Sequence, residues 1–315
     1  MVGRTNRPNG TPTYVPHVEG FYMRPSRMGF SHKIILVVLI TSLLVGGTVL
    51  RTPSVTSEPG ASPDDKAMED LSRVEYPSLK SIKWHPHFIQ PDESLETLFG
   101  TDWVWVARFN RIDRRHVYPG MTIKVPDNMG DIRGYTPLPR RYEAARRKEK
   151  YILVDITEQW LGAYEYGKLV FSVPAATGRP EAPTPTGLFR IGARDQNHTS
   201  SLYKTQDNEE QYPMDNAMRF YIDENSVGYW IHARDLPGRP ASHGCIGLYD
   251  EEMQKRVFGY PDKPVLLDAE KVYDWAVGKV DYEDDSGNLE ELEDAPEVEV
   301  RGELPRYLPR RPFRR

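Results

Sequence analysis

The residues with the clearest chemical potential lie in the stretch 229–249, which reads YWIHARDLPGRPASHGCIGLY. Cys245 is the only cysteine of the chain, it directly follows Ser242–Gly244, and His232 lies thirteen residues before it. A thiol becomes a useful nucleophile when it is partly exposed and a neighbouring base or cation lowers its pKa. An imidazole supplies both effects by forming a thiolate–imidazolium pair. This spacing predicts covalent catalysis with Cys245 as nucleophile and His232 as base.

Gly244 allows a tight backbone bend beside the thiol, so that nearby N–H groups can point at a developing oxyanion. One alternative is a zinc site formed by His232, His243 and Cys245, but it has only three ligands and no paired C-x-x-C spacing. A serine hydrolase at Ser242 is disfavoured because the G-x-S-x-G signature is absent. A buried, inert thiol is disfavoured by the adjoining Ser-His-Gly. We therefore predict neither a metal nor a cofactor.

Charge is distributed unevenly along the 315 residues, although the formal net charge is only −5 and gives no reason to expect nucleic-acid binding. Residues 1–33 carry five Lys or Arg and one acid. Residues 281–299 are acidic at ten of nineteen positions, and residues 301–315 carry six Arg and one Glu. Because the end of the chain is also poor in apolar residues, the sequence predicts a disordered charged tail over 281–315.

Residues 34–50 form an uncharged apolar stretch of seventeen residues, close to the lower limit for a membrane span. The basic segment 1–33 precedes it, which predicts a cytoplasmic N-terminus and export of everything after Arg51. A cleaved signal peptide is the alternative, and the long basic head and the lack of an A-x-A site disfavour it. Residues 51–80 are rich in Pro, Ser, Thr and acidic residues and are predicted to be a flexible linker.

Residues 81–127 show the order strand, helix, helix, strand. Apolar residues at i, i+3 and i+4 from Leu95 indicate one helix face, a second helix ends near Asn110, and MTIKVP at 121–126 is a strand. This order, with ESLETLFG and VYPGMTIKVP, resembles a LysM module. The resemblance implies binding of peptidoglycan glycan strands through N-acetylglucosamine. The alternative is a small domain that only packs against its neighbour.

From Tyr151 to Asp268 the pattern changes to short strands separated by Gly/Pro turns, which favours a β-sandwich or barrel. This segment resembles the YkuD-type L,D-transpeptidase catalytic domain. The resemblance is carried by YILVDITEQWLGAYEYGKLVFSVPAATG, TPTGLFRI, the IH at Ile231-His232 and the SHGCI at 242–246. It implies a β-sandwich, with Cys245 as nucleophile and His232 as general base. The positions that shape the site and its oxyanion hole are Ser242, His243 and Gly244.

The chain departs from the family pattern near both reacting groups. Ala233 follows His232 where the family usually has Gly, and Gly247 stands where the family commonly has Arg. The loop between His232 and the cysteine is also short. A planar guanidinium suits a substrate carboxylate, so we predict that Arg234 or Arg239 supplies this contact; the alternative is that both are solvated loop residues.

The reaction implied by the resemblance begins with attack of Cys245 on a tetrapeptide stem of peptidoglycan and loss of the terminal D-alanine. Transfer of the thioester to a stem amine gives a 3→3 cross-link. Water as acceptor would make an L,D-carboxypeptidase, and a lipoprotein amine would anchor a protein. A non-catalytic peptidoglycan tether is a further alternative, disfavoured by the presence of both Cys245 and His232. The S-x-x-K at 201–204 lacks its S-D-N and K-T-G companions, which excludes a D,D-transpeptidase.

The sequence thus predicts a mainly β, single-pass protein of the bacterial inner membrane whose catalytic domain faces the periplasm. Its expected partners are stem peptides, glycan strands and the membrane. The predicted parts are a basic cytoplasmic tail (1–33), a transmembrane helix (34–50), a linker (51–80), a LysM-like βααβ domain (81–127), a connector (128–150), a catalytic β-sandwich (151–270) and a charged tail (281–315).

Overall fold

The computed structural model describes residues 70–205, 210–278 and 289–309. The predicted cytoplasmic tail, the predicted transmembrane helix and the first part of the predicted linker lie outside these residues. Within the described ranges, no helix combines the length and the apolar character needed to cross a bilayer.

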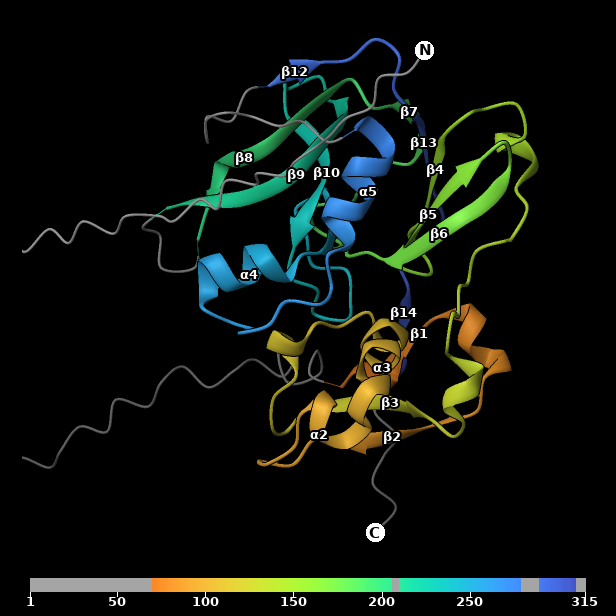
Figure 1. The fold of residues 1–315 in the computed structure, drawn as a ribbon, viewed down its shortest axis with the longest axis vertical. Helices are drawn as coiled ribbons and strands as arrows, with labels where there is room; N and C mark the ends of the chain where they lie inside the picture. The colour runs from red at the N-terminus through yellow and green to blue at the C-terminus, as the bar shows by residue number, and fades with distance from the viewer. Residues whose placement is uncertain (1–69, 206–209, 279–288, 310–315) are drawn as a thin grey trace, which may run out of the picture. The chain divides into compact units, whose positions relative to one another are not determined.

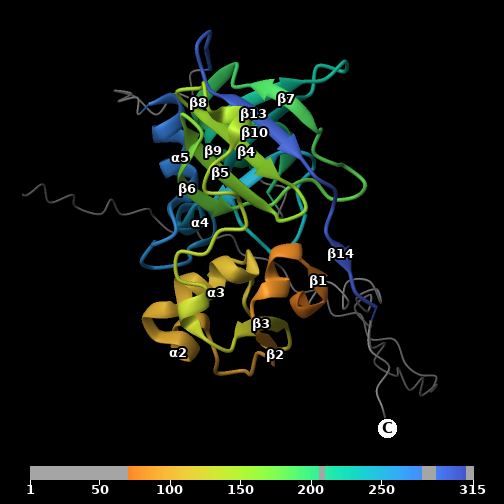
Figure 2. The ribbon, with the colours of Figure 1, turned by 90° about the vertical axis from the view of Figure 1, so that its right-hand side faces the viewer.

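Two five-stranded sheets form the β-rich part of the protein (Figures 1 and 2). The first sheet has the order β11-β10-β9-β8-β12 and contains β8 (Ala193–Lys204), β9 (Gln211–Ile222), β10 (Gly228–Arg234), β11 (Ile246–Tyr249) and β12 (Glu290–Glu291). The second has the order β6-β5-β4-β13-β7 and contains β4 (Tyr151–Asp155), β5 (Trp160–Glu165), β6 (Lys168–Pro174), β7 (Gly187–Arg190) and β13 (Glu297–Arg301).

Apolar side chains from both sheets join in one buried cluster, as the alternating pattern of the strands requires. Ile152 of β4 and Ile231 of β10 are both fully buried in it. Helix α4 (Glu251–Phe258) and helix α5 (Asp268–Val277) add to the same cluster, and α5 packs against β9, β10 and β11. The mainly β architecture predicted for this part of the chain is confirmed.

Strand β13 corrects the predicted disordered tail over 281–315 for residues 297–301; of that range the structure describes residues 289–309. Strand β13 lies inside the second sheet, parallel to β4 and antiparallel to β7. Val298 and Val300 are buried, while Glu297 and Glu299 alternate with them and face the other side. The acidic composition concealed this period-two pattern, because only every second residue of the strand needs to be apolar.

The end of the predicted linker is also folded, so the range 51–80 is wrong for its last residues. Residues 70–80 contain the 3₁₀ turns η1 (Leu71–Arg73) and η2 (Pro77–Ser81), separated by β1 (Val74–Glu75). Strand β1 pairs antiparallel with β14 (Arg306–Tyr307). Leu71, Val74 and Leu79 are buried, which explains why a stretch rich in polar residues nevertheless packs.

The N-terminal module has the predicted order of strand, helix, helix and strand. Strands β2 and β3 pair antiparallel, and Ser94 caps α2 by accepting from the Thr97 amide. The elements are β2 (Trp84–Phe88), α2 (Leu95–Phe99), η3 (Gly100–Asp102), α3 (Trp103–Asn110), η4 (Arg114–His116) and β3 (Thr122–Pro126). Whether this module is a LysM domain stays a prediction.

The module shares a core with the β-rich part. Val106 of α3 and Ile123 of β3 belong to one buried cluster with Leu236, Tyr249 and Leu266 from the other part. The predicted connector 128–150 packs as well, through short 3₁₀ turns at η5 (Met129–Asp131) and η6 (Glu143–Ala145). In the part of the chain that the structure describes, the module and the β-rich part therefore pack against each other through shared buried side chains.

Candidate active site

Strands β10 and β11 bring the predicted nucleophile and base to one place. They are parallel neighbours in which Ile231 pairs with Ile246 and His232 with Gly247. Cys245 directly precedes β11, so the register sets it beside the strand that carries His232. Both side chains line a cavity of about 1040 Å³. The other predicted site residues that line it are Ser242, His243 and Arg234.

His232 is buried and oriented by a backbone carbonyl. Its Nδ1–H donates to the Ala233 oxygen at 2.7 Å; since a carbonyl can only accept, this leaves Nε2 as the basic nitrogen. Burial lowers the pKa of His232 to about 3, and the charge of Arg234 acts in the same direction. The imidazole is therefore neutral at rest. The family's Gly is replaced by Ala233 without loss of this contact, because the acceptor is a main-chain atom.

Cys245 is partly exposed but packs beside Trp230 and Met214. Burial raises the pKa of its thiol to about 11, and the Trp230 backbone and the Arg234 charge oppose this only weakly. Burial therefore disfavours, in the resting protein, the thiolate–imidazolium pair that the sequence predicts. The physical reason is that both groups lie in surroundings that disfavour any charged form.

The Ser-His-Gly turn is held by the Ser242 hydroxyl. This hydroxyl accepts from the Gly244 amide at 3.0 Å and donates to the Cys245 carbonyl at 2.5 Å. Gly244 has a φ of +115°, and a Cβ there would lie 2.6 Å from the Tyr229 ring. Glycine is therefore required at this position. Its N–H is already bound within the turn, so it does not supply the predicted oxyanion contact.

Arg234 explains the glycine at the family's usual Arg position. A Cβ at Gly247 would lie 2.5 Å from Cδ of Arg234, whose stem occupies that space. The Arg234 guanidinium donates to the Ala241 carbonyl at 3.0 Å and lies at the cavity wall. Arg239 is absent from the described residues that line the cavity, and its charge acts instead on Tyr76 and Tyr307.

Several cavity residues gave no signal in the sequence. Tyr203 of β8 stacks on His243 with ring centroids 4.2 Å apart, and His198 stacks on Trp230 at the same separation. Arg115 reaches the cavity from the N-terminal module. All three positions depend on the long pairing of β8 with β9 or on docking of the module. Such tertiary contacts leave no local pattern, although paired aromatic residues in a polar strand are a weak hint.

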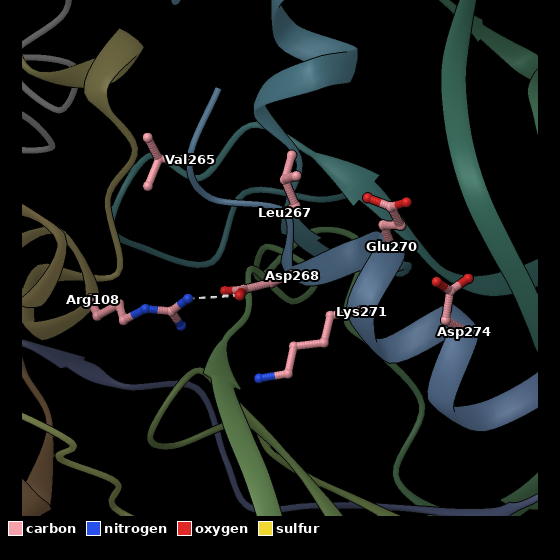
Figure 3. Close-up of a pocket in the computed structure, with 7 residues that line it drawn as sticks. All are labelled: Arg108, Val265, Leu267, Asp268, Glu270, Lys271 and Asp274. Atoms are coloured by element: carbon pink, nitrogen blue, oxygen red, sulfur yellow. Dashed lines mark hydrogen bonds and ion pairs between the residues drawn. The ribbon is translucent and has the colours of Figure 1, made fainter. Parts of the chain in front are cut away.

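A second, smaller cavity of about 410 Å³ lies where α3 meets α5 (Figure 3). Arg108 of α3 and Asp268 of α5 form an ion pair across it at 2.6 Å. The carboxylates of Glu270 and Asp274 point away from this pair (Figure 3). Among all described residues, no group of three or more His, Cys, Asp or Glu side chains is arranged to hold a metal ion. At this cavity, the ion pair between Arg108 and Asp268 joins the module to α5.

Comparison with known proteins finds one family model, that of the YkuD L,D-transpeptidase catalytic domain, which matches residues 149–276. No curated protein matches the chain. Solved structures that match include an L,D-transpeptidase from Mycobacterium smegmatis, with 20% identity over 49% of this chain and 59% of that one and a TM-score of 0.32. Another is an L,D-transpeptidase from Stackebrandtia nassauensis, with 20% identity over 56% and 66% and a TM-score of 0.35.

L,D-transpeptidase 3 from Mycobacterium tuberculosis also matches, with 20% identity over 49% of this chain and 61% of that one and a TM-score of 0.33. The match thus spans about three fifths of these structures, between 59% and 66% of their length. Residues 149–276, which contain both Cys245 and His232, match the YkuD-type L,D-transpeptidase catalytic domain.

Proposed function

We propose that the protein is a peptidoglycan L,D-transpeptidase of cell-wall biogenesis. The observation that carries the proposal is the register of β10 and β11, because it sets His232 and Cys245 in the wall of one large cavity. A nucleophile and a base that share a cavity, within a segment that matches the catalytic family, support acyl transfer.

The proposed reaction starts from the neutral pair. As Cys245 Sγ attacks the carbonyl of the third stem residue, Nε2 of His232 takes the thiol proton. The bond to the terminal D-alanine then breaks, and the imidazolium returns that proton to the leaving amine. The acyl group stays on Sγ as a thioester. An acceptor amine attacks this thioester, gives a proton to the imidazole and leaves with a new amide bond, and the proton returns to Sγ.

The oxyanion donor in this scheme is the amide of Cys245 itself. The Gly244 N–H is bound to Ser242 and is therefore unsuited to the task. A backbone amide fixed at the start of a strand needs no reorganisation when charge develops on the carbonyl oxygen. Ser242 would act by holding the turn in this orientation.

Covalent labelling tests the proposal directly. Incubation with a carbapenem should add the intact drug mass to the protein, as a thioester on Cys245. The Cys245→Ala variant should gain no mass and should not turn over a tetrapeptide stem, although one small side chain replaces another and folding is preserved. Failure of the parent protein to form an adduct would favour a non-catalytic peptidoglycan tether. Turnover by the alanine variant would refute the covalent mechanism.

The acceptor is identified by the products. Incubation with tetrapeptide muropeptides should give 3→3 cross-linked dimers, detectable by mass spectrometry. If tripeptides alone accumulate, water is the acceptor and the protein is an L,D-carboxypeptidase. If a lipoprotein lysine becomes joined to the stem, the protein is an anchoring enzyme.

Glycan binding by the module is a second part of the proposal. Phe88 and Tyr118 expose 55% and 42% of their surface. They lie on two segments that are joined by hydrogen bonds from the Gly120 amide to the Ile89 carbonyl and from the Ile89 amide to the Met121 carbonyl. Exposed aromatic faces suit the apolar faces of sugar rings. The full-length Cys245→Ala protein should sediment with insoluble peptidoglycan, and Phe88→Ala together with Tyr118→Ala should release it. Unchanged sedimentation of that double variant would assign binding elsewhere.

Membrane anchoring is proposed from the sequence of residues 34–50 and the basic residues before them. The full-length protein should fractionate with membranes, and a reporter fused after Arg315 should be active only outside the cytoplasm. A soluble form that begins after about residue 50 would instead support a cleaved signal peptide.

A further inference from the structure

The segment that follows α3 is hydrogen-bonded to the loop between His232 and Cys245. The Asp113 amide donates to the Leu236 carbonyl at 2.9 Å, and the Leu236 amide donates back to the Asp113 carboxylate at 2.5 Å. Ile112 forms a bridge with Pro237. This loop leaves β10 just after His232 and leads to the Ser-His-Gly turn. The module therefore holds part of the active-site frame.

Charged side chains continue this contact toward the cavity. His116 lies between two carboxylates, with Nδ1 at 3.0 Å from Asp113 and Nε2 at 3.1 Å from Asp235. Burial alone would lower the pKa of His116, but the two carboxylates outweigh it and raise the pKa to about 9. His116 is therefore a cation at neutral pH, and it ties the module to the residue that follows Arg234.

Arg115 lies between this ion network and the cavity. It donates to Asp235 at 3.0 Å, and its guanidinium carbon sits 3.9 Å from the centre of the Phe258 ring. Asp235 also accepts from the Tyr212 hydroxyl at 2.9 Å. Nε of Arg115 is buried and has no hydrogen-bond partner among the described residues. Its guanidinium is thus rigidly held and only partly satisfied, while it forms part of the cavity wall.

This end of the cavity carries an excess of positive charge. The ion network beside it contains three cations, Arg115, His116 and Arg234, and two carboxylates, Asp113 and Asp235, which leaves one positive charge in excess; Arg115, Arg234 and Asp235 line the cavity itself. Nε of Arg234 is also buried without a hydrogen-bond partner among the described residues. Two fixed guanidinium groups in the wall of one cavity match a carboxylate.

We infer that Arg115, supplied by the N-terminal module, binds a carboxylate of the peptide substrate together with Arg234 at this end of the cavity. The inference rests on the proposed function, since it assigns substrate contacts to that same cavity. The module then has two roles. It holds the loop between His232 and Cys245, and it supplies a side chain that binds the peptide. The competing explanation is that Arg115 only docks the module through Asp235.

Binding measured without turnover separates the two explanations. The full-length Cys245→Ala protein is titrated calorimetrically with a synthetic tetrapeptide stem, and with the same peptide amidated at its carboxylates, singly and together. Loss of one charge-assisted contact should weaken binding of the free acid about 10- to 100-fold in the Arg115→Gln variant. Amidation of the carboxylate that Arg115 binds should weaken peptide binding by the Cys245→Ala protein to a similar degree. The Arg115→Gln protein should bind the acid and that amide alike.

Arg108→Gln is the matched control. Arg108 also joins the module to the β-rich part through one carboxylate, but it lines the second cavity and not this one. Its replacement should leave peptide affinity unchanged. Arg115→Lys keeps a charge near Asp235 but lacks the planar fork, so it should recover only part of the affinity.

Equal affinity of the Cys245→Ala protein for acid and amides would overturn the inference, and this measurement needs no substitution at Arg115 or Arg108. Equal losses in the Arg108→Gln and Arg115→Gln proteins would overturn it too, because docking would then explain both. If the protein forms the carbapenem adduct and its Cys245→Ala variant binds the stem acid and amides alike, the inference alone is refuted. If the adduct is also absent, the proposed function fails with it.

Discussion

The centre of the cavity and the contact between module and loop both bury titratable side chains, yet with opposite results. His232 lies without a counter-charge and is neutral, with its pKa lowered to about 3. His116 lies between two carboxylates and stays charged, with its pKa raised to about 9. Burial disfavours a charged side chain that has no partner of opposite charge. Where carboxylates lie beside the side chain, they outweigh this effect and the group stays charged. The reacting groups are therefore neutral at rest, while His116, which helps to hold their loop, is charged at neutral pH.

The largest expected difference between the two regions is in turnover. His232→Ala should lower kcat on a tetrapeptide stem by about 10²–10⁴-fold, because it removes the group that accepts and returns the proton. His116→Gln should lower kcat far less, since its ring bonds only to carboxylates of the module and loop. Equal losses in the two variants would break the distinction between reacting and holding groups.

The next effect is on stability and concerns Asp113. Its carboxylate is fully buried and accepts from His116 and from the Leu236 amide, so Asp113→Ala should destabilise the protein by about 3–5 kcal/mol. Asp102→Ala is the control, because its pair with the exposed Arg133 is screened by solvent and should contribute little to stability. Urea unfolding measures both. Similar losses of unfolding free energy in the two variants would show that the contact of Asp113 with the loop adds no more stability than an exposed ion pair.

A smaller, pH-dependent effect isolates His116. The raised pKa means that the folded protein holds a proton on His116 that the unfolded chain releases between pH 6.5 and about 9. The stabilisation, of order 3 kcal/mol, should be complete below pH 6.5 and should disappear as the pH rises through 9. The measurement is the difference in unfolding free energy between the parent and His116→Gln across this window. A difference that stays constant would show that His116 is not protonated.

The smallest effect tests how tightly the cavity centre is packed. Gly247→Ala should destabilise the protein by about 1–3 kcal/mol, because the new Cβ would displace the stem of Arg234. In the Arg234→Ala background the same change should cost less, since the clash with Cδ at 2.5 Å is removed and only the one with Cβ at 2.7 Å remains. Thermal unfolding of the four proteins gives this comparison. Additive losses would mean that the two residues do not compete for space.

The sequence predicted that Cys245 and His232 would meet because their signal is local, and both line one cavity. Cys245, His232 and the Ser-His-Gly turn lie within one short stretch, and the strands that carry them alternate clearly. Arg115 was missed because it reaches the cavity from more than a hundred residues away, and its pairing with Asp235 spans 120 positions. The neutral state of the thiol was missed for a related reason: spacing reveals which groups meet but not how much water surrounds them.

The fold was predicted less evenly. The alternating strands of the β-rich part and the helix pair of the module follow from periodicity. Strand β13 was not predicted because its acidic composition outweighed the alternation of its apolar residues. The folding of residues 70–80 was not predicted because short turns contain few apolar residues. Composition averages over a window, whereas packing is decided residue by residue.

The place of β13 also governs the order in which the sheet can be completed. It pairs with β4 on one side and β7 on the other, and the contact between Arg301 and Asp155 closes a loop of 146 residues. Contacts this distant along the chain make folding slow. Until that last strand arrives, β4 and β7 present open edges that can recruit strands from other chains. A nascent or truncated chain that lacks residue 297 onward would therefore aggregate through those two edges before its nucleophile is ever usefully placed.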